Sequence, residues 1–197
     1  MKRLGNCFGK IISLDTLWLA HQRARRGKAH YADVQRVDAR PHRYLRKLRK
    51  DLATGRFTTS AYTAVNRVEG GKLRTIHKLP YYPDRIVHHA IMIVCGERWE
   101  RSLIRDTFQS LKGRGTSDAR KRVQKAVDGD RPTHYLQMDV RKFYPSIPNR
   151  VLKATVRRFV KCVPTLRLLD DIIDSIRGLP IGNYLSQILG NLVLSPV

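Results

Sequence analysis

The chain has few acidic residues and lacks the marks of a disulfide scaffold or a zinc domain. Its 197 residues include 16 Asp and Glu against 39 Lys and Arg, a formal net charge of +23 at pH 7. The three cysteines are far apart and odd in number, and no Cys-x-x-Cys motif occurs. This pattern argues against a disulfide framework or a zinc site and fits a reducing cytoplasm.

Long apolar segments are also missing. The longest uninterrupted run covers residues 90–95 and is far too short to span a bilayer. The first residues, MKRLGNCFGKIISLDTLW, contain neither a long apolar core nor a small-residue cleavage site, so they are not typical of a signal peptide. We therefore expect a cytoplasmic protein without a membrane partner.

Positive charge is concentrated at the beginning of the chain. The first sixty residues hold fifteen Lys and Arg against four Asp. Such a charge repels itself unless a polyanion lies nearby, and phosphate neutralisation gives sequence-independent affinity for nucleic acid. Nucleic acid is therefore the expected partner, with a solubilising surface as the alternative. The same two interpretations apply to the basic residues that surround the leucine stripe of a predicted helix at residues 41–54.

Hydrophobic periodicity and turn residues predict mixed α and β structure. Besides residues 41–54, helices are expected at 15–26 and 164–177 and after Pro83, Ser117, Pro148 and Asn183, and strands at 57–68 and 72–78 form a hairpin around Gly70-Gly71. His88 and His89 are neighbours in one helix, so they cannot chelate one metal together and are interpreted as core or surface residues. The turn cluster at residues 128–132 is the best candidate for a subdomain boundary.

The segment THYLQMDVRKFYPSIPN contains the carboxylate on which the functional interpretation depends. Residues 134–140 alternate in polarity and predict a short strand, with Leu136, Met138 and Val140 turned to a core. Asp139 then lies on the opposite face at the strand end, where an acid can hold a metal over a cleft. A turn or helix-capping role is the alternative for Asp139.

A second segment, LPIGNYLSQILGNLVLSP, follows the helix at 164–177. Gly182 permits a sharp turn or a close backbone approach, and Asn183 can cap a new helix. Ser186 and Gln187 lie near the beginning of that helix. Small polar groups at a helix N-terminus suit the approach of a nucleotide or a template strand.

Four segments, in this order along the chain, resemble motifs of reverse transcriptases. KLRTIHKLPYYPDRIVHHAI is similar to the first fingers motif of that family, and TFQSLKGRGTSDA is similar to the second. QMDVRKFYPSI resembles the first catalytic palm motif. GLPIGNYLSQ resembles the next motif, in the form seen in reverse transcriptases of diversity-generating retroelements, and Ile181 matches that type where many family members carry Gln.

The resemblance implies an α+β fold class: the fingers and partial palm of a right-hand polymerase, helix-rich, with a β-hairpin and an incomplete palm sheet. Residues 1–131 would form the N-terminal helices and fingers, and residues 132–197 the N-terminal half of the palm. The family's aromatic-x-Asp-Asp motif and thumb are not found, and Asp170-Asp171 is interpreted as part of a solvated helix face. We therefore expect a fragment of a larger enzyme that is inactive by itself.

The activity implied is RNA-directed DNA synthesis by nucleotidyl transfer with two Mg²⁺ ions. Asp139 would be the catalytic ligand of both ions, and the backbone carbonyl of Val140 would help to hold one of them. The implied partners are an RNA template, a DNA or RNA primer, dNTPs and a small basic accessory protein, in a bacterial or phage-encoded system. A catalytically inactive nucleic-acid-binding remnant and a group II intron or retron reverse transcriptase stay open as alternatives.

The resemblance also implies residues around the nucleotide. Tyr144 would lie under the sugar, with core packing as its alternative role. Lys72 and Arg74 would meet the triphosphate, or else be exposed hairpin charges. Lys112 and Arg114 would contact phosphate or template, or else belong to a solvated loop. The residues expected near the nucleotide and the template base are Gly182, Asn183, Ser186 and Gln187.

Overall fold

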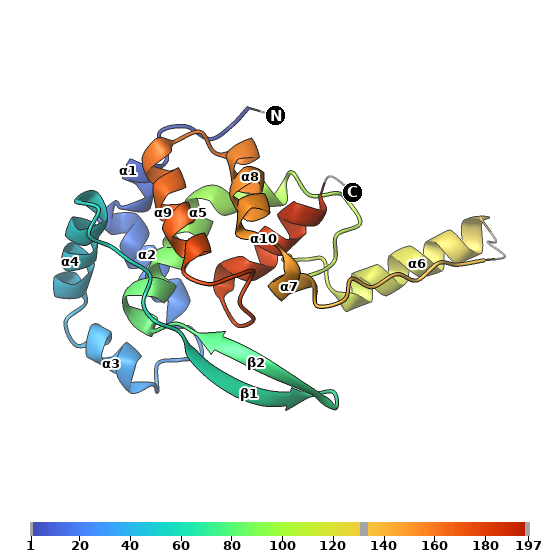
Figure 1. The fold of residues 1–197 in the computed structure, drawn as a ribbon, viewed down its shortest axis with the longest axis horizontal. Helices are drawn as coiled ribbons and strands as arrows, with labels where there is room; N and C mark the ends of the chain where they lie inside the picture. The colour runs from blue at the N-terminus through green and yellow to red at the C-terminus, as the bar shows by residue number, and fades with distance from the viewer. Residues whose placement is uncertain (1, 131–133, 196–197) are drawn as a thin grey trace.

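The computed structural model describes residues 2–130 and 134–195. The described chain is helix-rich with one antiparallel two-stranded hairpin (Figure 1), which confirms the α+β class. The helices are α1 (Phe8–Ile11), α2 (Leu14–Ala24), α3 (Ala32–Asp38), α4 (Pro41–Ala53), α5 (Ile86–Glu100), α6 (Thr116–Asp130), α7 (Phe143–Ser146), α8 (Asn149–Phe159), α9 (Val163–Asp174) and α10 (Tyr184–Leu194). The strands are β1 (Thr63–Glu69) and β2 (Lys72–Lys78), and a kinked turn, η1 (Tyr81–Arg85), leads into α5.

Helix α5 forms the centre of the helical core. It packs against α2, α1 and α10, and α10 in turn contacts α8, which packs on α9 (Figure 1). Ile86, Ala90 and Trp99 are fully buried, whereas Ile93 and Val94 are half-buried. His88 and His89 are buried as well, so α5 is covered on more faces than a single apolar stripe would require. A helix that is hydrophobic on most sides belongs inside a core.

The helices before the hairpin follow their local signals. Ser13 caps α2, because its hydroxyl accepts a hydrogen bond from the Thr16 N–H at 3.2 Å. Helix α4 begins with Pro41 at its first turn, and the predicted leucine stripe is buried. The short helix α3, which the sequence did not predict, buries Val34 and Val37.

The hairpin is paired as the turn residues predict. Gly70 and Gly71 both adopt positive φ in the turn, and the register places Arg67 opposite Arg74. The outer end of the hairpin extends away from the helices (Figure 1). Its base is fixed by a hydrogen bond from the His77 N–H to the Ile181 carbonyl at 2.9 Å. The hairpin is therefore attached to the segment that precedes α10.

The prediction of a strand at residues 134–140 is wrong. This segment has no regular secondary structure, and the side chains expected in a core, Leu136 and Met138, are each 81% exposed. Alternation gives a strand only if another strand satisfies its backbone groups. Within residues 2–130 and 134–195 the only paired strands are β1 and β2, so this segment has no such partner.

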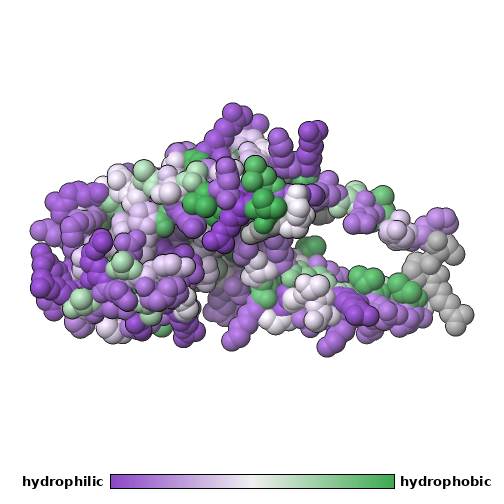
Figure 2. Space-filling view, turned by 90° about the horizontal axis from the view of Figure 1, so that it is seen from below, coloured by the Kyte–Doolittle hydropathy of each residue, from purple (hydrophilic) through white to green (hydrophobic). Residues whose placement is uncertain are grey.

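Helix α6 projects away from the helical core (Figure 1). Val123 in this helix is 63% exposed. In the space-filling view the visible surface is mostly hydrophilic, and hydrophobic patches lie toward the end from which α6 projects (Figure 2). The predicted cap at Ser117 is also wrong, since the helix begins at Thr116 and Asp118 accepts the Gly115 N–H at 3.0 Å.

The turn cluster predicted at residues 128–132 is partly helical. Residues 128–130 belong to α6, and residues 131 and 132 lie outside the described residues. The proposed division of the chain near residue 131 stays a prediction.

Candidate functional site

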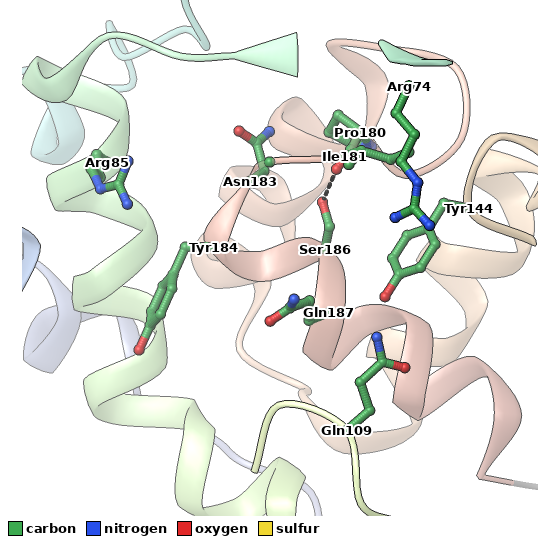
Figure 3. A pocket seen from close by; sticks show the side chains of 11 residues that line it. Arg74, Arg85, Gln109, Tyr144, Pro180, Ile181, Asn183, Tyr184, Ser186 and Gln187 are labelled. Carbon is green, nitrogen blue, oxygen red and sulfur yellow. Dashed lines mark hydrogen bonds between the residues drawn. The ribbon is translucent and has the colours of Figure 1, made fainter. Parts of the chain in front are cut away.

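A cavity of about 330 Å³ opens where the base of the hairpin meets the beginning of α10. Most of the side chains expected around a nucleotide line this cavity, although they come from three separate parts of the sequence (Figure 3). They are Arg74, Tyr144, Gly182, Asn183, Ser186 and Gln187.

Hydrogen bonds hold the turn at residues 180–184 that forms one wall. The Ser186 hydroxyl donates to the Pro180 carbonyl at 2.7 Å (Figure 3). The sequence predicted that Asn183 caps α10. Asn183 does occupy the N-cap position, but its side chain makes no capping hydrogen bond, so this prediction is wrong. Instead its Nδ2 donates to the Tyr62 hydroxyl at 3.1 Å, and that hydroxyl also lies 3.0 Å from the Ser175 Oγ. The wall is therefore tied to residues on both sides of the hairpin.

Gly182 provides the close approach that its sequence position predicted. Its φ is +105°, and a Cβ at this position would lie only 2.6 Å from the Ile76 Cγ2. Side chains larger than hydrogen would push β2 away from the turn. This contact fixes β2, from which Arg74 reaches over the cavity toward Tyr144 (Figure 3).

The residues that follow α9 fix the backbone of Tyr144. The Leu179 N–H donates to the Tyr144 carbonyl at 2.9 Å. Gly178 has a φ of +76°, and a Cβ there would lie 2.8 Å from the Pro145 carbonyl oxygen. Burial raises the pKa of the Tyr144 hydroxyl, so the side chain stays neutral. Tyr144 therefore both packs against the core and lines the cavity.

Asn149, the first residue of α8, links α8 to the end of α9 and the residues that follow it. Its Nδ2 donates to the carbonyls of Ile173 at 2.9 Å and Ile176 at 3.0 Å, which are carbonyls at the C-terminal end of α9 and just beyond it. Its Oδ1 accepts the Gly178 N–H at 2.9 Å. One side chain thus satisfies three backbone groups at a helix end, where such groups lack partners within the helix.

The cavity is suited to an anion. Arg74 and Arg85 both line it, and none of its described lining residues is acidic. Arg85 is half-buried, its pKa is lowered by burial, and its Nε has no hydrogen-bond partner among the described residues. An unpaired buried guanidinium nitrogen is costly unless a ligand satisfies it. Two guanidinium groups on one cavity match the geometry of phosphate oxygens.

Sequence reasoning did not single out Arg85, Gln109 or Tyr184, which also line the cavity. All three lie inside segments that resemble reverse transcriptase motifs. The resemblance therefore indicated the right segments but not these particular residues. The Gln109 carbonyl accepts a hydrogen bond from the Asn191 Nδ2 at 3.0 Å, which joins the second fingers segment to α10. Tyr184 stacks on His89 with 3.9 Å between ring centroids.

A second cavity, of about 530 Å³, borders the same turn at residues 182–184 and shares Arg85 with the first. Its walls include Lys28, Lys78 and the exposed ring of Tyr31. His88 also faces it, and burial lowers the pKa of that imidazole to about 3, so it is neutral. Basic side chains outnumber acidic ones around the two cavities, although Asp33 lines the second.

The remaining candidates are not brought to the cavity. Lys72 is exposed beside the hairpin turn, and Lys112 is exposed in its glycine-rich loop. Arg114 donates to the carbonyls of Arg105 at 3.3 Å and Ile104 at 3.5 Å, so it helps to close that loop. Asp139 and Val140 are exposed and do not line the cavity.

The described side chains do not by themselves complete a two-metal site. Asp139 is exposed, and no group of three or more His, Cys, Asp or Glu in the described ranges is placed to hold a metal ion. Two of the three carboxylates of α9 are engaged elsewhere: Asp170 accepts two hydrogen bonds from Arg157 at 2.9 and 2.5 Å, and Asp174 is paired with Lys153.

Comparison with known proteins gives no family assignment. Neither a protein-family model nor a curated protein matches the chain. Within the part of the chain that the structure describes, no helix has the length and apolar character needed to cross a membrane.

Proposed function

We propose that this chain forms the nucleotide- and template-binding part of a reverse transcriptase of the diversity-generating type. One observation carries the proposal. The four segments that resemble reverse transcriptase motifs are distant in sequence, yet each contributes to the same cavity: Arg74 from the first, Gln109 from the second, Tyr144 from the third and residues 180–187 from the fourth. Convergence of this kind is what a shared binding site requires.

The chemistry of the cavity supports a nucleotide as the ligand. Arg74 and Arg85 would pair with phosphate oxygens. Tyr144 would present its ring to the sugar, and its carbonyl is already fixed by Leu179. Ser186 is occupied by the Pro180 carbonyl, whereas the side chain of Gln187 is exposed and can reach a base edge. The net charge of +23 supports the approach of the polyanionic template.

Catalysis would need carboxylates in addition to Asp139. In the proposal Asp139 remains the metal-binding and catalytic carboxylate, with the Val140 carbonyl beside it. Because the described residues do not complete that site, the activity proposed for the chain by itself is binding without nucleotidyl transfer. The same observation favours the second candidate function, a nucleic-acid-binding protein that does not catalyse polymerisation.

Binding of an RNA template annealed to a DNA primer, followed by fluorescence anisotropy, tests the proposal. Arg74→Ala removes one phosphate contact and is expected to weaken binding roughly 5- to 30-fold, as about 1–2 kcal/mol of charge-assisted hydrogen bonding implies. Arg101→Ala is the matched control, because Arg101 is exposed, paired with Glu97 and far from the cavity lining. If both substitutions weakened binding equally, the loss would come from the lower positive charge of the protein, and a binding site at the cavity would be contradicted.

A further inference from the structure

A third cavity, of about 330 Å³, is formed by α2 and α4, and α4 lies at the end of the molecule opposite to α6 (Figure 1). None of its lining residues lines either cavity at the turn before α10. All of them also precede the four segments that resemble reverse transcriptase motifs. The residues that line this cavity are Leu14, Asp15, Trp18, His42, Leu45 and Arg46.

Each of the two helices contributes an aromatic ring to this cavity. The rings of Trp18 and His42 are nearly parallel, with 5.3 Å between their centroids and an angle of 6° between their planes. Trp18 is 39% exposed, whereas the other tryptophan, Trp99, is fully buried. Tryptophan is highly buried on average, so an indole open to a cavity is available for a ligand. Every nucleobase has a flat face that stacks on aromatic side chains of this kind.

The charge around these rings is positive and mostly unpaired. Arg46 lies one turn after His42 on the same face of α4, and its side chain has no ion-pair partner among the described residues. Within the described part of the chain, Lys47 is the one basic residue of α4 with an ion pair, to Asp51 at 2.6 Å. Phosphate groups beside a base stacked in the cavity would neutralise these charges. The exposed basic residues of α4 are Arg43, Arg46, Lys47, Arg49 and Lys50.

Asp15 is the one acidic residue that lines this cavity. It lies one turn before Trp18 on the same face of α2, and it is exposed. Its carboxylate repels phosphate, so the phosphate groups of a bound strand would follow α4 and not α2. A carboxylate accepts hydrogen bonds from the exocyclic amino group of cytosine. Asp15 therefore fits the base of a bound nucleotide, whereas Arg46 fits its phosphate.

We propose that the cavity between α2 and α4 binds a base of a single-stranded nucleic acid, stacked on Trp18, with the neighbouring phosphates on Arg46 and the basic face of α4. Charge complementarity favours this occupant over a protein segment, because α4 carries five basic residues and one acidic residue. The site goes beyond the proposed function, since it shares no lining residue with the cavity beside Arg74. A strand can therefore bind here whether or not that cavity is occupied.

The tryptophan emission of the folded wild-type chain, titrated with a short oligocytidine RNA, tests the proposal. Stacking of a base on an indole quenches its emission, and the burial of Trp99 shields that indole from the RNA. We therefore expect saturable quenching that comes from Trp18 and is lost in Trp18→Phe. Emission that the RNA leaves unchanged, or quenching that persists in Trp18→Phe, would overturn the proposal.

Charge-matched variants locate the phosphate contact with the same titration, because Trp18 remains as the reporter. Arg46→Ala is expected to weaken binding roughly 5- to 30-fold, the effect of one lost charge-assisted contact. Arg49→Ala removes the same charge from α4 but does not line the cavity, so a loss below about 3-fold is expected. Arg74→Ala should leave this titration unchanged, which separates the site from that of the proposed function. A loss in Arg49→Ala or Arg74→Ala as large as that in Arg46→Ala would contradict a site between α2 and α4.

Discussion

Gly182 lies so close to Ile76 that a Cβ on the glycine would be 2.6 Å from the Ile76 Cγ2. This single contact joins β2 to the turn before α10, and the adjacent hydrogen bond from His77 to the Ile181 carbonyl fixes its register. Arg74 extends from the same strand over the cavity (Figure 3). The position of the Arg74 guanidinium group therefore depends on the absence of a side chain at residue 182.

Gly182→Ala is expected to destabilise this junction. A non-glycine residue at φ +105° is strained, and the added methyl group overlaps Ile76, so we expect the free energy of unfolding to fall by about 2–4 kcal/mol. Urea denaturation measures this loss. Gly115→Ala is the control, because nothing lies within 4 Å of the corresponding Cβ and its φ is not in the positive range. A loss of the same size in both variants would show that the contact with Ile76 is unimportant.

Asn149→Ala is expected to loosen the connection between α9 and Tyr144. The substitution removes three hydrogen bonds to backbone groups, so a loss of about 2–4 kcal/mol in the free energy of unfolding is expected. The control, Asn66→Ala, removes one exposed hydrogen bond with Thr75 in the hairpin and should cost less than about 1 kcal/mol. Equal stability of the two variants in urea denaturation would argue against the role assigned to Asn149.

Acid is expected to destabilise the fold through His88 and His89. Burial lowers the pKa of His88 to about 3 and that of His89 to about 4, whereas an exposed imidazole titrates near 6.5. The unfolded chain therefore takes up protons below pH ~6.5 that the folded chain does not, and stability present above that pH is lost as the pH falls toward 4. Between pH 7 and 5 we expect a loss of roughly 2–4 kcal/mol.

The buried carboxyl of Asp84 offsets part of this loss. Burial raises its pKa, so the folded chain takes up a proton there more readily than the unfolded chain as the pH falls. Urea denaturation at pH 7, 6 and 5 measures the net slope. His89→Gln should make the slope smaller, because it removes one of the two depressed imidazoles. A free energy of unfolding that does not change over this range would contradict the burial of both histidines.

Asp139→Asn is expected to leave the stability of the chain unchanged within about 0.5 kcal/mol, since exposed substitutions outside special features have small effects. Asp139 is exposed in a segment without regular structure. Thermal or urea unfolding of the two proteins provides the comparison. A clear loss of stability would mean that the carboxylate has a structural partner and would favour the turn or capping role over metal binding.

The sequence predicted those elements whose signals are local. The buried stripe of α4, the apolar faces of α2 and α10, and the glycine turn of the hairpin all depend on residues a few positions apart. The positive φ of Gly182 was likewise anticipated from its place between Ile181 and Asn183. These features need no knowledge of which distant segments meet.

Features that depend on distant partners were missed. Alternation at residues 134–140 could not reveal that no described strand lies beside them. Arg85 was missed as a site residue because its role depends on the turn at residues 182–184, almost a hundred positions later. In each case the decisive contact is made by tertiary packing.

Photo-crosslinking tests the central claim, that a template strand occupies the cavity, most directly. The chain would be irradiated with a primer–template that carries 5-iodouridine at the first unpaired template position, and the modified peptides would be mapped by mass spectrometry. The account predicts cross-links to Tyr144 or Tyr184, the two tyrosines that line the cavity. Cross-links confined to the basic surface of α4, with both tyrosines unmodified, would contradict it.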